Sequence, residues 1–236
     1  MIRFYAPDIE STGMLPEVES GHCCRVLRKQ EGDVINVVDG KGNAFECRII
    51  DAHPKKTMVE INSKVQEKPH WDCRITIAIA PTKNMDRMEW FVEKIVELGV
   101  DEIVFLNCEH SERKIVKPER VEKIMISAMT QSMKSKMPVL RANIPFKDFI
   151  AGVSASEKFM GYCNENFPLK SFVKEYHPGE DVTVLIGPEG DFSPAEVERA
   201  VDAGFVPVSF GATRLRTETA GLYAVCAVHA VNSLIS

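Results

Sequence analysis

Two stretches near the C-terminal end of this 236-residue chain hold the residue types that could do chemistry. The first is IGPEGD at residues 186–191, which follows an apolar run. The second is RLRTET at residues 214–219, which precedes a long apolar segment. Charged and hydroxyl groups near a buried face are costly unless they are paired or used. The second stretch therefore predicts a binding or catalytic site.

The GPEG sequence in the first stretch indicates a flat ligand and disfavours a nucleoside triphosphate. Phosphate-binding loops supply many backbone N–H groups, whereas Pro188 has none, and the glycine spacing matches neither the phosphate-loop nor the dinucleotide motif. Gly187 and Gly190 permit a tight turn that brings the backbone close to a ligand. A plain turn between a strand and a helix explains GPEG equally well, and it is the second stretch that favours a site.

Cysteine and histidine spacings predict no metal centre. The seven cysteines form no C-x-x-C pair, and the six histidines form no H-E-x-x-H motif. The N-terminus lacks a basic region followed by an apolar block, and no apolar run reaches the roughly 18 residues of a membrane span. We therefore expect a cytoplasmic protein without a metal, a disulfide framework or a membrane segment.

The elements that would position the two stretches alternate between strand and helix from Cys73 onward. This order predicts an α/β fold with a mostly parallel sheet, and ligands of such sheets bind at the carboxyl ends of the strands. After GPEG a helix is predicted, with Ser193 as N-cap, Pro194 at its first position and Glu196 completing a capping box. Another helix is predicted before Gly99, with a buried face formed by Met88, Phe91, Val92, Ile95 and Leu98.

The first 66 residues carry strand signals and predict a small β-barrel or sandwich. DVINVVDGKGNAFECRII is two β-rich runs joined by a hairpin turn. A polar stretch at residues 64–72 is the predicted linker, so we expect domains at residues 1–68 and 73–236. A further helix is predicted over residues 117–137, with a packed stripe formed by Met125, Met129, Met133 and Met137.

Charge is distributed unevenly along the chain. The net charge of −5 argues against a wholly basic nucleic-acid binder, but between His110 and Lys147 nine Lys or Arg residues stand against three Glu residues, a net charge of +6. Most charge runs are solvated faces, yet such an excess on an acidic protein favours RNA. The candidate RNA-binding residues are Arg3, Arg25, Arg28, Arg113, Lys114 and Lys134.

The succession of motifs resembles the RsmE family of SPOUT-class methyltransferases. IGPEGDFSPAE is followed about 25 residues later by RLRTETA, and HCCRVLRKQEGD, EKIVELGV, SERK and SAMTQSMKSKMPVL resemble the family's other motifs in the same order. The resemblance implies methylation of a uridine at N3 in 16S ribosomal RNA within the 30S subunit, with S-adenosylmethionine as the cofactor. It also implies a homodimer, a C-terminal domain with a trefoil knot and a PUA-like β-barrel domain before it.

The resemblance also implies which residues form the site. Carried over by position, the loops around the adenosyl group are expected to contain Cys163 and Asn164, then Ile186, Gly187, Pro188 and Gly190, then Phe210, Gly211, Leu215 and Arg216. For catalysis, Glu218 is the expected base for the N3 proton, and Arg216 is expected to stabilise charge on the uracil carbonyls. The helix dipole alone also accounts for a glutamate at the start of a helix.

Two departures from the family pattern lie in the same stretches. The family commonly has GPEGG, where this chain has Asp191 in last place, and aspartate tolerates a positive φ better than most residues. Arg214 stands where an aliphatic residue is usual, and Thr213 where an arginine is usual. The alternatives that remain open are a knotted ribose 2′-O-methyltransferase, a non-catalytic RNA-binding adaptor of the same fold, and a metabolic α/β enzyme without an RNA partner.

Overall fold

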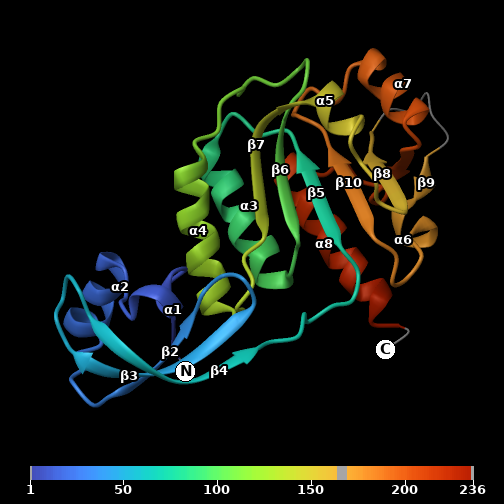
Figure 1. Cartoon of the computed structure of the whole chain (residues 1–236). Helices are drawn as coiled ribbons and strands as arrows, with labels where there is room; N and C mark the ends of the chain where they lie inside the picture. The colour runs from blue at the N-terminus through green and yellow to red at the C-terminus, as the bar shows by residue number, and fades with distance from the viewer. Residues whose placement is uncertain (1, 164–168, 235–236) are drawn as a thin grey trace. The chain divides into compact units, whose positions relative to one another are not determined.

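The computed structural model describes residues 2–163 and 169–234, which divide into two compact units (Figure 1). The first unit contains the chain up to His70 together with Met125–Met137, and the second contains Trp71–Ile124 and the chain from Pro138 onward. Residues 125–137 lie in the first unit because their end pairs with the turn after β2. There the N–H of Met137 donates to the carbonyl of Gly40, with a donor–acceptor distance of 2.9 Å.

The first unit is built on one four-stranded sheet in the order β1-β2-β3-β4. The predicted hairpin is confirmed, because β2 and β3 pair antiparallel, and the Asp39 carboxylate accepts from the N–H groups of Lys41 and Asn43 in its turn. A second sheet, as in a sandwich, is not found in the described part of this unit. Its strands and helical segments are β1 (Arg3–Tyr5), α1 (Ile9–Thr12), α2 (Glu17–Gly21), a π-helical turn (His22–Val26), β2 (Val34–Val38), β3 (Asn43–Asp51) and β4 (Met58–Gln66).

The second unit contains a seven-stranded sheet in the order β7-β6-β5-β10-β8-β11-β9. All of its strand pairs are parallel, which confirms the predicted α/β class. Parallel strands bring their carboxyl ends to one edge, so the loops after β8, β10 and β11 are neighbours. The strands are β5 (Ile75–Ile79), β6 (Glu102–Asn107), β7 (Val139–Pro145), β8 (Glu157–Gly161), β9 (Lys170–Ser171), β10 (Val182–Ile186) and β11 (Val206–Ser209).

Helices cover both faces of this sheet (Figure 1). On one face, α5 (Phe146–Ile150) and α7 (Pro194–Asp202) join a core that includes Ala78 and Leu185. On the other face, α3 (Met85–Leu98) and α8 (Thr217–Asn232) pack on each other, and α8 packs on β5 and β10. A short helix, α6 (Phe172–Glu175), contacts α8. The central strands β5 and β10 are buried along their whole length because both faces of the sheet are covered.

Two helix predictions are confirmed at their ends. Ser193 and Glu196 form the predicted capping box of α7, with Pro194 in its first turn. Gly99 ends α3 with a φ of 120°. Four of the five residues predicted for the buried face of α3 are buried, but Leu98 is 41% exposed. Leu98 is the last helical residue, and the buried stripe is completed by Val96 instead.

The helix predicted over residues 117–137 ends early. The observed helix, α4 (Pro118–Gln131), stops because Met133 adopts a left-handed φ of 60° and the Ser132 hydroxyl bonds to the carbonyl of Ala128 at 2.6 Å. Met125 and Met129 are fully buried, as a packed stripe requires, but Met133 lies beyond the helix and is partly exposed. The predicted four-methionine stripe was therefore wrong in its second half.

Candidate active site

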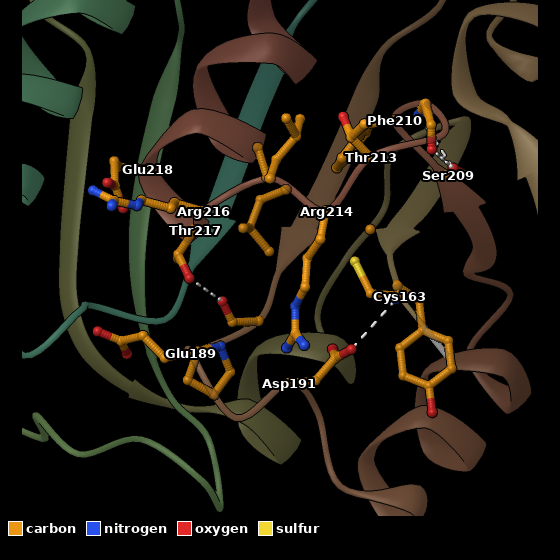
Figure 2. Close-up of a pocket in the computed structure, with 18 of the residues that line it drawn as sticks. Cys163, Glu189, Asp191, Ser209, Phe210, Thr213, Arg214, Arg216, Thr217 and Glu218 are labelled. Carbon is orange, nitrogen blue, oxygen red and sulfur yellow. Dashed lines mark hydrogen bonds between the residues drawn. The ribbon is translucent and has the colours of Figure 1, made fainter. Parts of the chain in front are cut away.

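A cavity of about 840 Å³ lies at the carboxyl ends of β8, β10 and β11. Its walls are the loops that follow these three strands, together with the first turn of α8 and Arg87 of α3 (Figure 2). Both stretches that the sequence marked for chemistry therefore reach the same cavity. This is the edge at which parallel sheets bind ligands.

Most of the predicted site residues line this cavity. They are Cys163, Ile186, Gly187, Pro188, Phe210, Gly211, Leu215, Arg216 and Glu218. Gly190 does not line it, because this glycine faces His110, whose Cβ would be 3.2 Å from a Cβ added at Gly190. Asn164 lies outside the described residues. Sequence reasoning did not select Arg87, Glu189 or Thr217, which also line the cavity.

Thr217 joins the two stretches to each other. Its hydroxyl donates to the carbonyl of Gly187 at 3.1 Å, and the contact is buried. Gly187 is itself closely packed, since a Cβ there would lie 3.2 Å from both Asp191 Oδ1 and the Phe192 ring. The start of α8 thus holds the GPEG loop, and the absence of a side chain at Gly187 lets the loop close on itself.

The ring of Phe210 packs directly against the backbone of Gly161. A Cβ at Gly161 would collide with its ring, so the glycine is needed for this close approach. Behind it, Phe172 is fully buried and meets the Phe210 ring edge-on, with 5.4 Å between centroids. The aromatic wall of the cavity is therefore supported by the core of the second unit.

Asp191 links the GPEG loop to its neighbours. The residue has a φ of 62°, which aspartate tolerates, and its carboxylate accepts from the N–H of Phe192 at 2.8 Å and the N–H of Cys163 at 3.3 Å. Burial raises the pKa of Asp191, while the two backbone donors and the charges of Arg214 and His110 act in the opposite direction. A ring nitrogen of His110 also lies 3.1 Å from the carbonyl of Asp191.

Glu218 is a buried carboxylate with spare acceptor capacity. Its side chain is 8% exposed, and Oε1 lies 3.9 Å from Nε of Arg87. Its other oxygen, Oε2, is buried and has no hydrogen-bond partner among the described residues. Buried polar atoms in native proteins are almost always satisfied, and Glu218 lines the cavity, so its orphaned oxygen is a candidate acceptor for a donor group of a ligand.

Glu189, the acidic residue of GPEG, ties strand ends together. It accepts from the N–H of Lys83 at 3.0 Å, and Arg113 donates twice to the carbonyl of Lys83, at 3.1 and 2.7 Å. The loops after β5, β6 and β10 are thereby joined. Arg113, selected as an RNA-binding residue, is at least partly engaged in this structural role.

The other selected cations differ in how strongly they are held. Arg25 and Arg28 are exposed in the first unit, and Lys114 is exposed in the second. Arg3 instead makes a two-pronged ion pair with Glu67, at 2.8 and 2.5 Å. Lys134 donates to the Ser132 hydroxyl at 3.0 Å.

The described residues contain neither a metal-binding cluster nor a membrane-spanning helix. No group of three or more His, Cys, Asp or Glu side chains is arranged to hold a metal ion. No helix combines the length and apolar character that a membrane crossing needs.

Comparisons with known proteins agree on one class. A family model described as an RNA methyltransferase domain matches residues 69–229, and a model described as an RNA methyltransferase PUA domain matches residues 15–61. The chain therefore belongs to the RNA methyltransferase family. Within that class, it is 31% identical to ribosomal RNA small subunit methyltransferase E of Synechocystis, over 94% of this chain and 74% of the relative. The RsmE resemblance is thereby confirmed.

Solved structures extend the likeness to the whole chain. A probable rRNA-methyltransferase from Porphyromonas gingivalis is 49% identical, with a TM-score of 0.96 and full coverage of both chains. Ribosomal RNA small subunit methyltransferase E from Neisseria gonorrhoeae, bound to S-adenosylmethionine, is 30% identical, with a TM-score of 0.85 over 98% of each chain. The architecture described above is thus that of an rRNA methyltransferase fold.

Proposed function

We propose that this chain methylates N3 of a uridine in small-subunit ribosomal RNA, and that the reaction takes place in the cavity at the ends of β8, β10 and β11. The chain is an S-adenosylmethionine-dependent methyltransferase of small-subunit ribosomal RNA. The single observation that carries the position and the roles is Glu218, a residue that lines the cavity and has a buried carboxylate oxygen without a hydrogen-bond partner among the described residues.

The lining of the cavity fits S-adenosylmethionine. Backbone and apolar side chains from three loops suit a purine ring and a ribose. The carboxylates of Glu189, Asp191 and Glu218 also line the cavity and can bind the positively charged groups of the cofactor. The cofactor supplies an electrophilic methyl group. Loops that hold both reactants in line can contribute about 7–11 kcal/mol to lowering the barrier, so positioning is the chief task of these residues. The residues proposed to hold the cofactor are Cys163, Ile186, Gly187, Pro188, Phe210, Gly211, Leu215 and Arg216, while Gly190 acts indirectly through the loop.

Uridine N3 carries a weakly acidic proton, which must leave for the nitrogen to become nucleophilic. Glu218 Oε2 is the proposed acceptor of that proton. Arg216, which is exposed at the cavity, would donate hydrogen bonds to the uracil carbonyls as negative charge develops there. Nε of Arg87 lies 3.9 Å from the other oxygen of Glu218 and places a positive charge beside the proposed base.

The partners and the finer fold belong to the same proposal. RNA would contact the cations Arg25, Arg28 and Lys114, with Arg3, Arg113 and Lys134 contributing through the loops that they support. The proposal includes a trefoil knot, a homodimer and a cytoplasmic location, and family membership supports all three. In support of a dimer, Tyr223 of α8 is 36% exposed, whereas Val225 on the same helix is fully buried. The proposed domain at residues 1–68 would then supply RNA contacts, and the proposed domain at residues 73–236 would catalyse methyl transfer.

The decisive experiment maps methylated nucleosides by mass spectrometry in small-subunit RNA from cells that lack this protein. We expect one 3-methyluridine to be missing, to return with the wild-type gene, and to stay missing with Glu218→Gln. Loss of a 2′-O-methyl group instead would support a ribose methyltransferase. An unchanged set of nucleosides would contradict an enzymatic role in small-subunit RNA.

A further inference from the structure

Asp191 and Arg214 come from different loops and face one another in the cavity. Asp191 follows β10, and Arg214 follows β11. Figure 2 shows the guanidinium group of Arg214 directed towards the carboxylate of Asp191. Burial raises the pKa of that carboxylate, and the positive charge of Arg214 opposes part of the rise. The described structure nevertheless has no ion pair or hydrogen bond between them. The two opposite charges therefore lie near each other without forming an ion pair.

The carboxylate of Asp191 is held in a fixed direction. Its two oxygens accept from the backbone N–H groups of Phe192 and Cys163, which belong to different loops. A carboxylate has about four acceptor positions, so two remain for a further donor. Burial disfavours its charge, and a cationic donor in the cavity would offset that cost.

Arg214 has the complementary property. Its side chain lines the cavity, is exposed, and makes no hydrogen bond or ion pair with the described residues. A guanidinium group presents five N–H donors in a planar fork that matches a carboxylate. Its place beside an anchored carboxylate gives the cavity one anionic and one cationic group a short distance apart.

We propose that Asp191 and Arg214 bind the amino-acid end of S-adenosylmethionine, with Asp191 accepting from its α-ammonium group and Arg214 donating to its α-carboxylate. The inference rests on the cofactor site proposed above. A zwitterion needs one acceptor and one donor of opposite charge, and these two residues supply them. Arg216 also lines the cavity without a side-chain partner among the described residues, but in Figure 2 it lies with Glu218, away from Asp191.

Isothermal titration calorimetry with two product-like ligands isolates this subsite. S-Adenosylhomocysteine and 5′-methylthioadenosine share the adenosine and a thioether, and they differ by the amino-acid end. Asp191→Asn and Arg214→Met should each reduce the affinity for S-adenosylhomocysteine about 10- to 100-fold, because each removes a hydrogen bond between charged groups. The affinity for 5′-methylthioadenosine should stay within about twofold of wild type, and Arg216→Met should preserve the ratio between the two ligands.

Decarboxylated S-adenosylmethionine separates the two residues. Arg214→Met should bind it as wild type does, whereas Asp191→Asn should bind it more weakly, because the ligand keeps its ammonium group. Equal loss of both product-like ligands, an unchanged ratio in both variants, or loss of the ratio in Arg216→Met alone would overturn the assignment. If wild-type protein bound neither 5′-methylthioadenosine nor S-adenosylhomocysteine, the cofactor site itself would be wrong.

Discussion

Glu218 is the proposed base of the reaction, because it lines the cavity and one of its carboxylate oxygens has no partner among the described residues. Glu218→Gln keeps the shape of the side chain but gives up its capacity to take a proton, so single-turnover methylation should slow about 10²- to 10⁴-fold. Cofactor affinity, measured by calorimetry, should change little, because the proposed role concerns the acceptor base. Glu198→Gln on the exposed side of α7 is the matched control and should react normally. A normal rate in Glu218→Gln would remove this residue from the chemistry.

Close packing around Gly187 determines how a substitution there would act. Its missing Cβ faces Asp191 and Phe192 and not open cavity, so Gly187→Val would act by forcing the GPEG loop apart. Overpacking of this kind costs about 1–3 kcal/mol of stability. We expect a lower midpoint in urea unfolding and at least tenfold weaker cofactor binding by calorimetry.

Gly152 provides the control for that substitution. Its nearest neighbour would lie 3.8 Å from an added Cβ, which is ordinary contact, so Gly152→Ala should leave both stability and cofactor affinity unchanged. If Gly187→Val bound cofactor normally in a folded protein, the GPEG loop would not shape the site.

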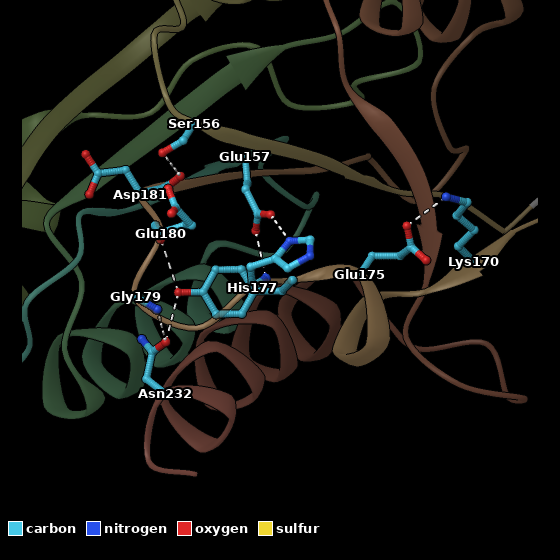
Figure 3. Close-up of polar contacts among 10 residues, drawn as sticks. Ser156, Glu157, Lys170, Glu175, His177, Gly179, Glu180, Asp181 and Asn232 are labelled. Atoms are coloured by element: carbon cyan, nitrogen blue, oxygen red, sulfur yellow. Dashed lines mark hydrogen bonds and ion pairs between the residues drawn. The ribbon is translucent and has the colours of Figure 1, made fainter. Parts of the chain in front are cut away.

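At the scale of elements, the turn after α6 is attached to β8 by one histidine (Figure 3). A ring nitrogen of His177 lies 2.5 Å from Glu157 Oε1, and the backbone N–H of His177 donates to Glu157 Oε2 at 3.0 Å. Glu157 raises the pKa of His177 above its ordinary 6.5. Stability gained from this pair is therefore fully present below pH 6.5 and is lost as the pH rises through the folded-state pKa.

Thermal unfolding at two pH values tests this contact. The melting temperature of wild type should exceed that of His177→Asn by more at pH 6 than at pH 9. The difference should be small, because the ring is exposed and surface ion pairs contribute little. His53→Asn is a suitable control, since no ion pair with a carboxylate is described for His53. A gap between wild type and His177→Asn that widened towards pH 9 would contradict the assignment.

At the scale of the whole molecule, we expect RNA to contact those cationic side chains that are exposed and not bonded to other groups of the protein. Arg25→Ala, Arg28→Ala and Lys114→Ala should each weaken binding to 30S particles and reduce the slope of log affinity against log salt by about one unit. Filter binding between 50 and 200 mM salt, a range over which phosphate contacts lose much of their strength, gives that slope.

Arg3 and Arg113 provide the contrast. Arg3 is paired with Glu67, and Arg113 bonds to the carbonyl of Lys83, so their removal should lower thermal stability more than it lowers the salt slope. Cofactor affinity should not change in Arg25→Ala or Arg28→Ala, because these residues are outside the cavity lining. A salt slope that was unchanged in all three exposed variants would place the RNA elsewhere.

Residue spacing predicted the local features of this protein well. The capping box of α7, the glycine that ends α3 and the hairpin of the first unit all depend on residues a few positions apart, so their signals stand next to each other in the chain. The end of α4 was missed because Met133 takes a left-handed conformation, which its residue type disfavours and which its surroundings impose.

The motif order was sufficient for the family and the cofactor, and most of the residues that it selected for the cofactor site and for catalysis line the cavity, because they lie in short stretches at strand ends. Arg87 beside Glu218 and Arg214 facing Asp191 were not predictable in this way. Each pair joins segments far apart in the chain, and what brings them together is the strand order, in which β5, β10, β8 and β11 follow one another across the sheet. That order results from packing and chain-closure free energies summed over the whole domain, and no local pattern of residues records such a sum.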